Sequence, residues 1–279
     1  MRIIPAERLR QAVEALILSV SRTLPEDVRA AMEQALRDEQ TALGQEVLRQ
    51  LLANADYAAE QKLPVCQDTG TAVFFVELGE DARVGGDGLR AELEAATRSA
   101  YKKGFLRNSM CHPFTRKNTG DNTPISLHLE LVKGDGLRIR FIPKGGGAEN
   151  MSRCTMYAPS KGRQGVFDFV MDTVKQAGPN PCPPIIVGVG VGGTFDLAPV
   201  LAKEALLMPL DEVNPDPDAA SLEAELKAAI NKLPIGPGGF GGTQTCLGVR
   251  VLLRPCHIAS LPVAVNIQCN AARHGEISL

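Results

Sequence analysis

Hydrophobic residues in the first part of the chain, residues 1–62, recur at the spacing of α-helices. One predicted helix carries a single apolar stripe, formed by Leu9, Val13, Leu16, Ile17 and Val20. Thr23 and Glu26 are spaced as a capping box, which predicts that Thr23 begins a second helix. A third helix is predicted over residues 43–60. The chain therefore opens with a helical region.

From residue 63 to residue 279, strand patterns alternate with helical ones. The near-continuous apolar run TAVFFVEL, 71–78, predicts a strand covered on both faces. Two alternating strands, 125–131 and 137–143, are separated by KGDG, which predicts a hairpin. Further strands are predicted over 185–191, 247–254 and 262–268, and further helices over 89–103, 165–176 and 195–207, with VNPDPDAAS as a surface excursion. We therefore predict an α/β fold, with a helical N-terminal region and mixed α/β sheet layers in a single domain.

Composition narrows the class of protein. The chain has 279 residues, of which 44% are hydrophobic and 22% charged, and its net charge is −2. This charge is too small to suggest nucleic acid or an anionic membrane as a partner. The N-terminus runs straight into a charged amphipathic pattern and the apolar runs are short, so we expect neither a signal peptide nor a membrane span. Seven cysteines without paired spacing indicate reduced thiols in the cytoplasm.

Three glycine-rich segments are candidates for binding an anion through main-chain N–H groups. GVGVGG, 188–193, lies between a predicted strand and helix, and Asp211 lies 18 residues beyond it, so a nicotinamide-dependent oxidoreductase is one reading. The segment after that helix does not resemble a second strand, which favours close strand–helix packing instead. KGGGAEN, 144–150, and GPGGFGGTQT, 236–245, are predicted to hold a carboxylate or phosphate, with flexible connectors as the alternative.

Three cysteines lie at predicted strand ends or proline turns among polar neighbours: Cys66, Cys182 and Cys269. Their separations are too long for a zinc knuckle, but they fit a cluster assembled by the fold, and thiolates are the natural ligands of iron–sulfur clusters. We interpret the other four cysteines as structural thiols.

His257 lies in the turn between the last two predicted strands, 12 residues before Cys269. A hairpin-like return of the chain would bring the two side chains close together. A structural histidine is the alternative.

Six motifs, in this order, resemble a known family: CQDTG (66–70), RKNTGDNTP (116–124), KGGGAEN (144–150), VGVGVGGTFD (187–196), GPGGFGGTQT (236–245) and CHIASLPVAVNIQCNAARH (256–274). They are similar to the α region of class I fumarate hydratases and L-tartrate dehydratases, which are iron–sulfur hydro-lyases. The resemblance runs from about residue 10 to the end of the chain.

The resemblance implies roles for individual residues. It implies that Cys66, Cys182 and Cys269 bind a 4Fe–4S cluster whose fourth iron binds substrate. It implies substrate-binding positions at Gln67, Asp68, Arg107, Gly145, Gly146 and Gly147, and catalytic positions at Asp68 and His257. In this scheme Asp68 protonates the leaving hydroxyl of a dicarboxylate and Arg107 clamps its distal carboxylate.

The resemblance also implies a partner chain. Single-chain members carry a second domain, whereas this sequence ends at Leu279, so it resembles the α subunit of an enzyme whose β subunit completes the active site, in an assembly such as α2β2. The implied reaction is the reversible hydration of fumarate to (S)-malate, a step of the tricarboxylic acid cycle. Dehydration of L(+)-tartrate is the closest alternative, and a non-catalytic scaffold subunit without iron is another.

Overall fold

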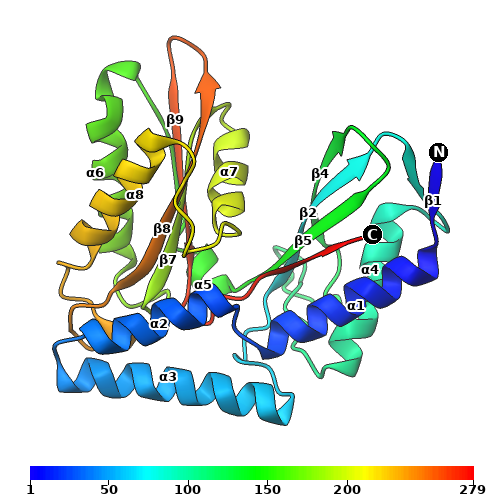
Figure 1. Ribbon diagram of the computed structural model, residues 1–279, viewed down its shortest axis with the longest axis horizontal. Helices are drawn as coiled ribbons and strands as arrows, with labels where there is room; N and C mark the ends of the chain where they lie inside the picture. Colours follow the sequence, from blue (N-terminus) through cyan, green and yellow to red (C-terminus); the bar gives the residue numbers. More distant parts are fainter. The chain divides into compact units, whose positions relative to one another are not determined.

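The computed structural model describes residues 1–279 and divides them into two compact units. Unit 1 consists of Met1–Pro25, Asn54–Gly146 and Arg273–Leu279, and unit 2 of Glu26–Ala53 and Gly147–Ala272. Each unit combines helices with a four-stranded sheet (Figure 1), which confirms the predicted α/β class. A single domain over residues 1–279 stays a prediction.

Unit 1 contains a sheet with the strand order β10-β5-β2-β4 and a separate parallel pair, β1 and β3. The strands are β1 (Arg2–Ile4), β2 (Thr71–Gly79), β3 (Ala82–Val84), β4 (Ser126–Val132), β5 (Leu137–Lys144) and β10 (Gly275–Ser278). Helices α1 (Ala6–Arg22) and α4 (Leu89–Lys103) pack together on one face of the sheet (Figure 1).

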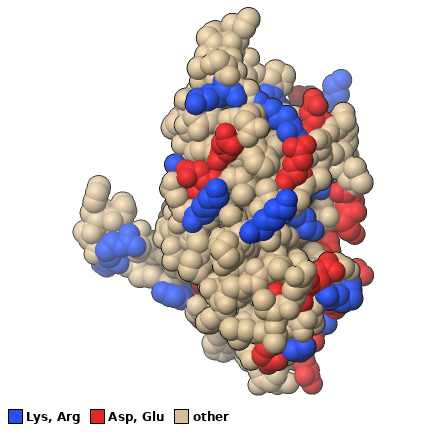
Figure 2. Space-filling view, turned by 90° about the vertical axis from the view of Figure 1, so that its left-hand side faces the viewer, with Lys and Arg blue, Asp and Glu red and all other residues tan.

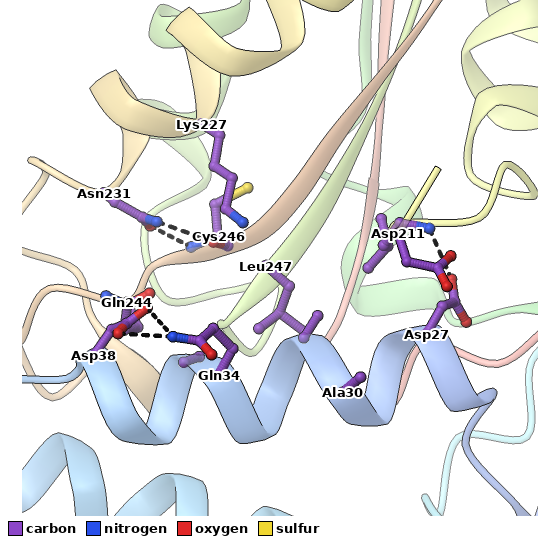
Figure 3. Close-up of a pocket in the computed structure, with 13 residues that line it drawn as sticks. Asp27, Ala30, Gln34, Asp38, Asp211, Lys227, Asn231, Gln244, Cys246 and Leu247 are labelled. Carbon is purple, nitrogen blue, oxygen red and sulfur yellow. Dashed lines mark hydrogen bonds between the residues drawn. The ribbon is translucent and has the colours of Figure 1, made fainter. Parts of the chain in front are cut away.

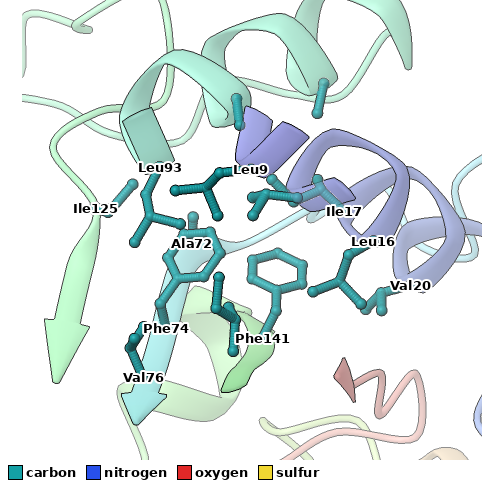
Figure 4. Packing of buried hydrophobic residues seen from close by; sticks show 14 of the residues in the cluster. Leu9, Leu16, Ile17, Val20, Ala72, Phe74, Val76, Leu93, Ile125 and Phe141 are labelled. Carbon is teal, nitrogen blue, oxygen red and sulfur yellow. The ribbon is translucent and has the colours of Figure 1, made fainter. Parts of the chain in front are cut away.

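The predicted apolar stripe of α1 faces this sheet, and its five residues are all buried. Figure 4 shows four of them, Leu9, Leu16, Ile17 and Val20, packed against β2 and β5, where the rings of Phe74 and Phe141 lie 5.0 Å apart. On the other face of β2, the ring of His128 stacks on Phe75 at 4.6 Å and the guanidinium of Arg140 lies over the same ring. Both faces of β2 are therefore covered, one by helices and the other by neighbouring side chains.

The predicted hairpin of β4 and β5 is wrong. β2 lies between the two strands and pairs parallel with β4 and antiparallel with β5. The most apolar of the three strands takes the central position because a central strand is buried most completely. The connecting turn crosses the end of β2, where the Gly79 N–H donates to the carbonyl of Gly136 at 2.8 Å.

The predicted capping box is also wrong. Thr23 ends α1, because its N–H and its hydroxyl both donate to the carbonyl of Ser19, at 3.1 and 2.8 Å. The next helix, α2, begins at Glu26. The hydroxyl that would cap α2 is thus used to close the last turn of α1.

Unit 2 contains a sheet with the strand order β6-β9-β7-β8. Its strands are β6 (Arg153–Tyr157), β7 (Ile185–Gly193), β8 (Cys246–Cys256) and β9 (Leu261–Gln268). Its complete helices are α2 (Glu26–Asp38), α6 (Gly162–Ala177), α7 (Leu197–Ala205) and α8 (Pro217–Ile230). It also contains most of α3 (Ala42–Gln61) and nearly all of the single turn α5 (Gly146–Glu149). Two short 3-10 turns, η1 (Pro159–Lys161) and η2 (Pro237–Gly239), complete the unit. Helices α6 and α8 cover one face of the sheet and α7 covers the other (Figure 1).

Helix α8 is absent from the predicted elements, although its start carries a recognisable signal. The side chain of Asp216 accepts hydrogen bonds from the N–H groups of Asp218 and Ala219, and Pro217 occupies the first helical position. The prolines and aspartates of VNPDPDAAS resemble a loop, but they are the cap of a helix.

The glycines of β7 permit close packing of a helix. Gly188 and Gly190 lie within the strand, and a Cβ on either would overlap a main-chain carbonyl of α7, that of Ala202 or that of Ala198. The intervening valines point to the opposite face and join the core beneath α6 and α8. These glycines therefore face a helix backbone, which leaves no room there for the pyrophosphate of a dinucleotide.

No helix combines the length and the apolar character needed to cross a membrane. On most of the face displayed in Figure 2, basic and acidic side chains are interspersed, whereas the lobe that projects at its left shows basic side chains.

Candidate active site

The turn before β2 in unit 1 fixes the carboxylate of Asp68 with main-chain donors. The N–H of Gly70 donates to Oδ1 at 3.1 Å, and the N–H of Gly146 donates to Oδ2 at 2.8 Å. The thiol of Cys66 donates to the amide oxygen of the exposed Gln67 at 3.4 Å. Each oxygen of Asp68 thus has one backbone partner, so the side chain has a defined orientation.

The main chain after Asp68 is held by two buried side chains, those of Tyr101 and Asn122. The hydroxyl of Tyr101 donates to the carbonyls of Thr69 and Gly70, both at 2.9 Å, and the amide of Asn122 donates to that of Gly70 at 3.1 Å. Burial raises the pKa of the Tyr101 phenol, so it stays protonated and able to donate at neutral pH. Only the NTGDN motif hints at Asn122, and no local pattern points to Tyr101.

Asp68 lines a polar cavity of about 350 Å³ within unit 1. The other lining residues are Thr71, Arg107, Asn108, Ser109, Cys111, Arg116, Asn118, Lys144 and Gly146. Arg107, Arg116 and Lys144 bring three positive charges against one carboxylate. Two arginines that can each bind a carboxylate through a planar fork, beside hydroxyl and amide groups, suit a small dianion.

The rim of this cavity is a loop that folds back on itself through its asparagines. Asn108 donates to the carbonyl of Gly120 at 2.7 Å, and Asn118 donates to the carbonyl of Asn108 at 2.8 Å. Residues 111 and 118 form an isolated bridge between the two arms. The amides of RNS and RKNTGDN thus give the loop the shape that places Arg107 and Arg116 on the cavity.

The glycines of KGGG allow the end of β5 to approach the Asp68 turn. Gly70 has φ +79°, and a Cβ there would lie 2.7 Å from the main-chain nitrogen of Lys144. A Cβ on Gly145 would lie 3.3 Å from Oδ2 of Asp68. Gly147 belongs to unit 2, where a Cβ would lie 3.6 Å from the carbonyl of Asn180.

Cys182 and Cys269 lie at the same end of the unit 2 sheet. Cys182 precedes β7 and Cys269 follows β9, and these antiparallel strands pair with Ile186 opposite Gln268. Asn270 fastens the two segments, because its N–H and its side-chain amide both donate to the carbonyl of Cys182, at 3.0 and 2.9 Å. Two of the three predicted cluster ligands therefore belong to one local structure.

The third predicted ligand, Cys66, belongs to unit 1. None of the seven cysteines forms a disulfide bond. Neither unit on its own holds a group of three or more His, Cys, Asp or Glu side chains arranged to bind a metal. A cluster bound by all three thiols stays a prediction.

The GPGGFGGTQT loop does bind a carboxylate, but the carboxylate is the chain's own. Buried Glu39 accepts hydrogen bonds from the N–H groups of Thr243 and Gln244, at 2.8 and 2.9 Å, and from the N–H and hydroxyl of Thr41. The same loop packs on the Cys182 segment, where the N–H of Gly238 donates to the carbonyl of Pro183 at 2.8 Å. The loop thus supports the segment that carries Cys182.

The expectation that His257 approaches Cys269 is wrong within this unit. β8 and β9 do not pair with each other, since β7 lies between them. His257 follows β8 at one end of the sheet, whereas Cys269 follows β9 at the other, and a strand of eight residues spans about 25 Å. His257 is exposed, lines a largely apolar cavity with Ile258, and accepts the N–H of Ala259 at Nδ1. Its catalytic role stays a prediction.

Another cavity in unit 2, of about 340 Å³, lies between α2 and the start of β8 (Figure 3). Asp27, Asp38 and Asp211 line it with only one lysine, Lys227, so its charge is unfavourable for a dianion. Cys246 also lines it, and burial raises the pKa of that thiol to about 12, as expected of a structural cysteine. Of these two cavities, the one beside Asp68 has the charge that suits a dicarboxylate.

Comparison with known proteins assigns the family. The family model described as "Fumarate hydratase (Fumerase)" matches residues 10–278. The "Putative L(+)-tartrate dehydratase subunit alpha" of Methanocaldococcus jannaschii is 38% identical over 272 residues, which cover 95% of each chain. The "L(+)-tartrate dehydratase subunit alpha" of Escherichia coli strain UTI89 is 32% identical over 274 residues, which cover 97% of this chain and 90% of that protein. With its family motifs gathered around Asp68 and at the Cys182–Cys269 end of a sheet, the chain belongs to the fumarate hydratase (Fumerase) family.

Proposed function

We propose that this hydro-lyase chain is the α subunit of a two-subunit enzyme that reversibly hydrates fumarate to (S)-malate. The observation that carries the proposal is the cavity of unit 1, in which the carboxyl group of Asp68, held by two N–H donors, faces three cationic side chains. Such a lining suits a small dicarboxylate that must gain or lose water.

In the dehydration direction, the chain's own residues would bind the substrate and supply one proton. Arg107 would bind the distal carboxylate, because a guanidinium forms two parallel hydrogen bonds with it. Asp68 would donate a proton to the hydroxyl oxygen, which leaves as water as the C–O bond breaks. The proton on the neighbouring carbon goes to a base, which we assign to a β subunit. Acid or base groups of this kind contribute about 10²–10⁴-fold to a rate.

Cys66, Cys182 and Cys269 would hold a 4Fe–4S cluster, which when bound supplies a Lewis acid that polarises the substrate's C–O bond. The chemistry of the donors supports this assignment, since all three are reduced thiols in turns at strand ends.

L(+)-tartrate dehydration is the second candidate, because both relatives above carry that name. The same cavity could take a substrate with one more hydroxyl group. The word "alpha" in those names also supports a β partner for this chain, and α2β2 is the expected assembly. Reduced thiols and an exposed iron would suit the cytoplasm.

The test is to coexpress the chain with its β partner and purify the complex without oxygen. We expect about four irons and four sulfides per α chain, and hydration of fumarate that exceeds dehydration of tartrate. Replacing any one of the three predicted ligands by serine should remove most of the iron, whereas Cys154→Ser and Cys256→Ser serve as matched controls and should not.

Three outcomes would count against the proposal in different ways. Faster turnover of tartrate would establish the second candidate. An iron-free complex that is unaffected by Cys66→Ser would indicate a scaffold subunit. Iron retained after loss of Cys182 or Cys269 would overturn the assigned ligand set.

A further inference from the structure

Arg273 is a buried cation next to the candidate acid. Its side chain is only 2% exposed, and Nη2 donates to the main-chain carbonyl of Asp68 at 3.0 Å. Nε and Nη1 are also buried and make no hydrogen bond to another protein group, and the guanidinium forms no ion pair with a carboxylate of the chain. Asp68 therefore receives the one side-chain hydrogen bond that Arg273 makes.

Such an arrangement is costly for folding. A buried guanidinium loses its hydration, and here neither an ion pair nor a full set of acceptors offsets the loss. An apolar side chain of similar length would fill the same space without this cost. The one hydrogen bond that this side chain makes, to the Asp68 carbonyl, is therefore the contact through which we look for its role.

That contact completes a row of three anchored carbonyls. Tyr101 holds the carbonyls of Thr69 and Gly70, Asn122 also holds that of Gly70, and Arg273 holds that of Asp68. The carbonyls that Tyr101 and Asn122 hold belong to Thr69 and Gly70, one and two residues after Asp68. Arg273 acts on the peptide unit of Asp68 itself, and this peptide sets the direction in which the carboxyl side chain leaves the main chain.

We propose that Arg273 is a positioning residue that fixes the main chain of Asp68, so that its carboxyl group meets the substrate oxygen in the reactive orientation. The inference rests on the proposed role of Asp68 as proton donor. It concerns kcat more than substrate binding, because the guanidinium is buried beneath the turn and the carboxylate-binding side chains of the cavity are not altered.

The test compares Arg273→Met and Arg273→Lys with Arg140→Met in the α–β complex. Arg140 is a matched control, since it is a largely buried arginine of the same unit that lies on the ring of Phe75. We expect Arg273→Met to lower kcat by about 100-fold with KM within threefold of the parent, since small misplacements of reacting groups have effects of this size. Arg273→Lys retains a cationic N–H donor that can reach the carbonyl and should recover at least tenfold, and Arg140→Met should leave kcat unchanged within twofold.

Hydrogen exchange of the amides of residues 66–70, measured on the same complexes, gives a readout independent of turnover. It should accelerate in Arg273→Met and stay at the parent rate in Arg140→Met. A kcat within twofold of the parent in Arg273→Met, or unchanged exchange, would overturn the proposal. If Arg273→Met does not fold, the same two measurements on Arg273→Gln and Arg273→Lys decide it. If the parent complex turns over neither substrate, the proposed function fails, whereas exchange still reports whether Arg273 anchors the turn.

Discussion

The main-chain N–H of Gly146 donates to Oδ2 of Asp68 at 2.8 Å, which joins two motifs that lie 78 residues apart in the sequence. The neighbouring Gly145 faces the same oxygen, and its Cβ position lies 3.3 Å from it. The glycine loop is therefore shaped around the carboxyl group of Asp68. A side chain added to this loop should therefore disturb the carboxyl group of Asp68 wherever its Cβ crowds Oδ2.

Gly145→Ala should impair the enzyme, whereas Gly146→Ala should be tolerated. A methyl group on Gly145 crowds Oδ2 of Asp68 and displaces it by a few tenths of an ångström, whereas one on Gly146 would lie 3.8 Å away, an ordinary contact. We expect kcat to fall about tenfold for Gly145→Ala and less than threefold for Gly146→Ala, by analogy with other small misplacements of catalytic groups. Steady-state kinetics of the two complexes decides; equal effects would show that the carboxyl group is not held by this loop.

Asp68→Asn should preserve the iron content and remove most of the activity. Asparagine keeps the size of the side chain but cannot donate a proton as an acid does, so the loss should be about 10²–10⁴-fold. Iron analysis and kinetics of the complex measure both parts, with Asp135→Asn in an exposed turn as the control. A nearly normal rate would show that another group protonates the leaving oxygen.

Local patterns predicted most elements, since the stripe of α1 and the run of β2 are set by neighbours in sequence. Pairing between distant strands was harder. KGDG between β4 and β5 resembles a hairpin turn, yet β2 inserts between them because it has the more apolar side chains. The same inference failed at β8 and β9, where β7 takes the central place, and that error placed His257 beside Cys269.

The residues of the candidate site were also predictable only in part. Asp68, Arg107 and the KGGG glycines were recognisable from motifs, and unit 1 places Asp68, Arg107, Gly145 and Gly146 together around one cavity or its edge, whereas Gly147 belongs to unit 2. Tyr101 and Arg273 were not, because their role is to hold carbonyls of the Asp68 turn, and no sequence spacing encodes a contact between positions so far apart. The glycine-rich composition of GPGGFGGTQT indicated that this loop could bind a carboxylate. Only the fold shows that the carboxylate is that of Glu39.

Glu39→Gln should destabilise the chain and flatten its acid dependence. Burial opposes ionisation of Glu39, but hydrogen bonds from Thr41, Thr243 and Gln244 outweigh it and hold the pKa of Glu39 below its usual value of 4.5. A folded-state pKa below the unfolded one adds stability above about pH 4.5, and this stability is lost as the pH falls through the folded-state pKa. The variant should lose about 1–3 kcal/mol of unfolding free energy at pH 7.

Denaturant unfolding at pH 7 and at about pH 3.5 measures this effect, since the deficit of Glu39→Gln should shrink at the lower pH. Glu33→Gln is the matched control, because Glu33 forms an exposed ion pair with Arg29 and should change stability by less than about 1 kcal/mol. A deficit of the same size at both pH values would mean that the charge of Glu39 is not what binds the loop.

Gly190→Ala should destabilise unit 2 severely. The new methyl group would overlap the carbonyl of Ala198, which belongs to the backbone of α7 and can move only if the helix shifts away from the sheet. Overpacking in a well-packed core typically costs about 1–3 kcal/mol and occasionally more, and a clash with a rigid backbone should lie at the upper end of this range. Gly136→Ala is the matched control, since a Cβ there meets no atom within 4 Å, and it should change stability by less than about 0.5 kcal/mol. Thermal or denaturant unfolding of both variants measures the difference. The opposite result would be a Gly190→Ala chain that unfolds like the parent but binds a nicotinamide dinucleotide more weakly than the parent does. That result would mean that Gly190 is needed to bind a ligand and not to pack against α7.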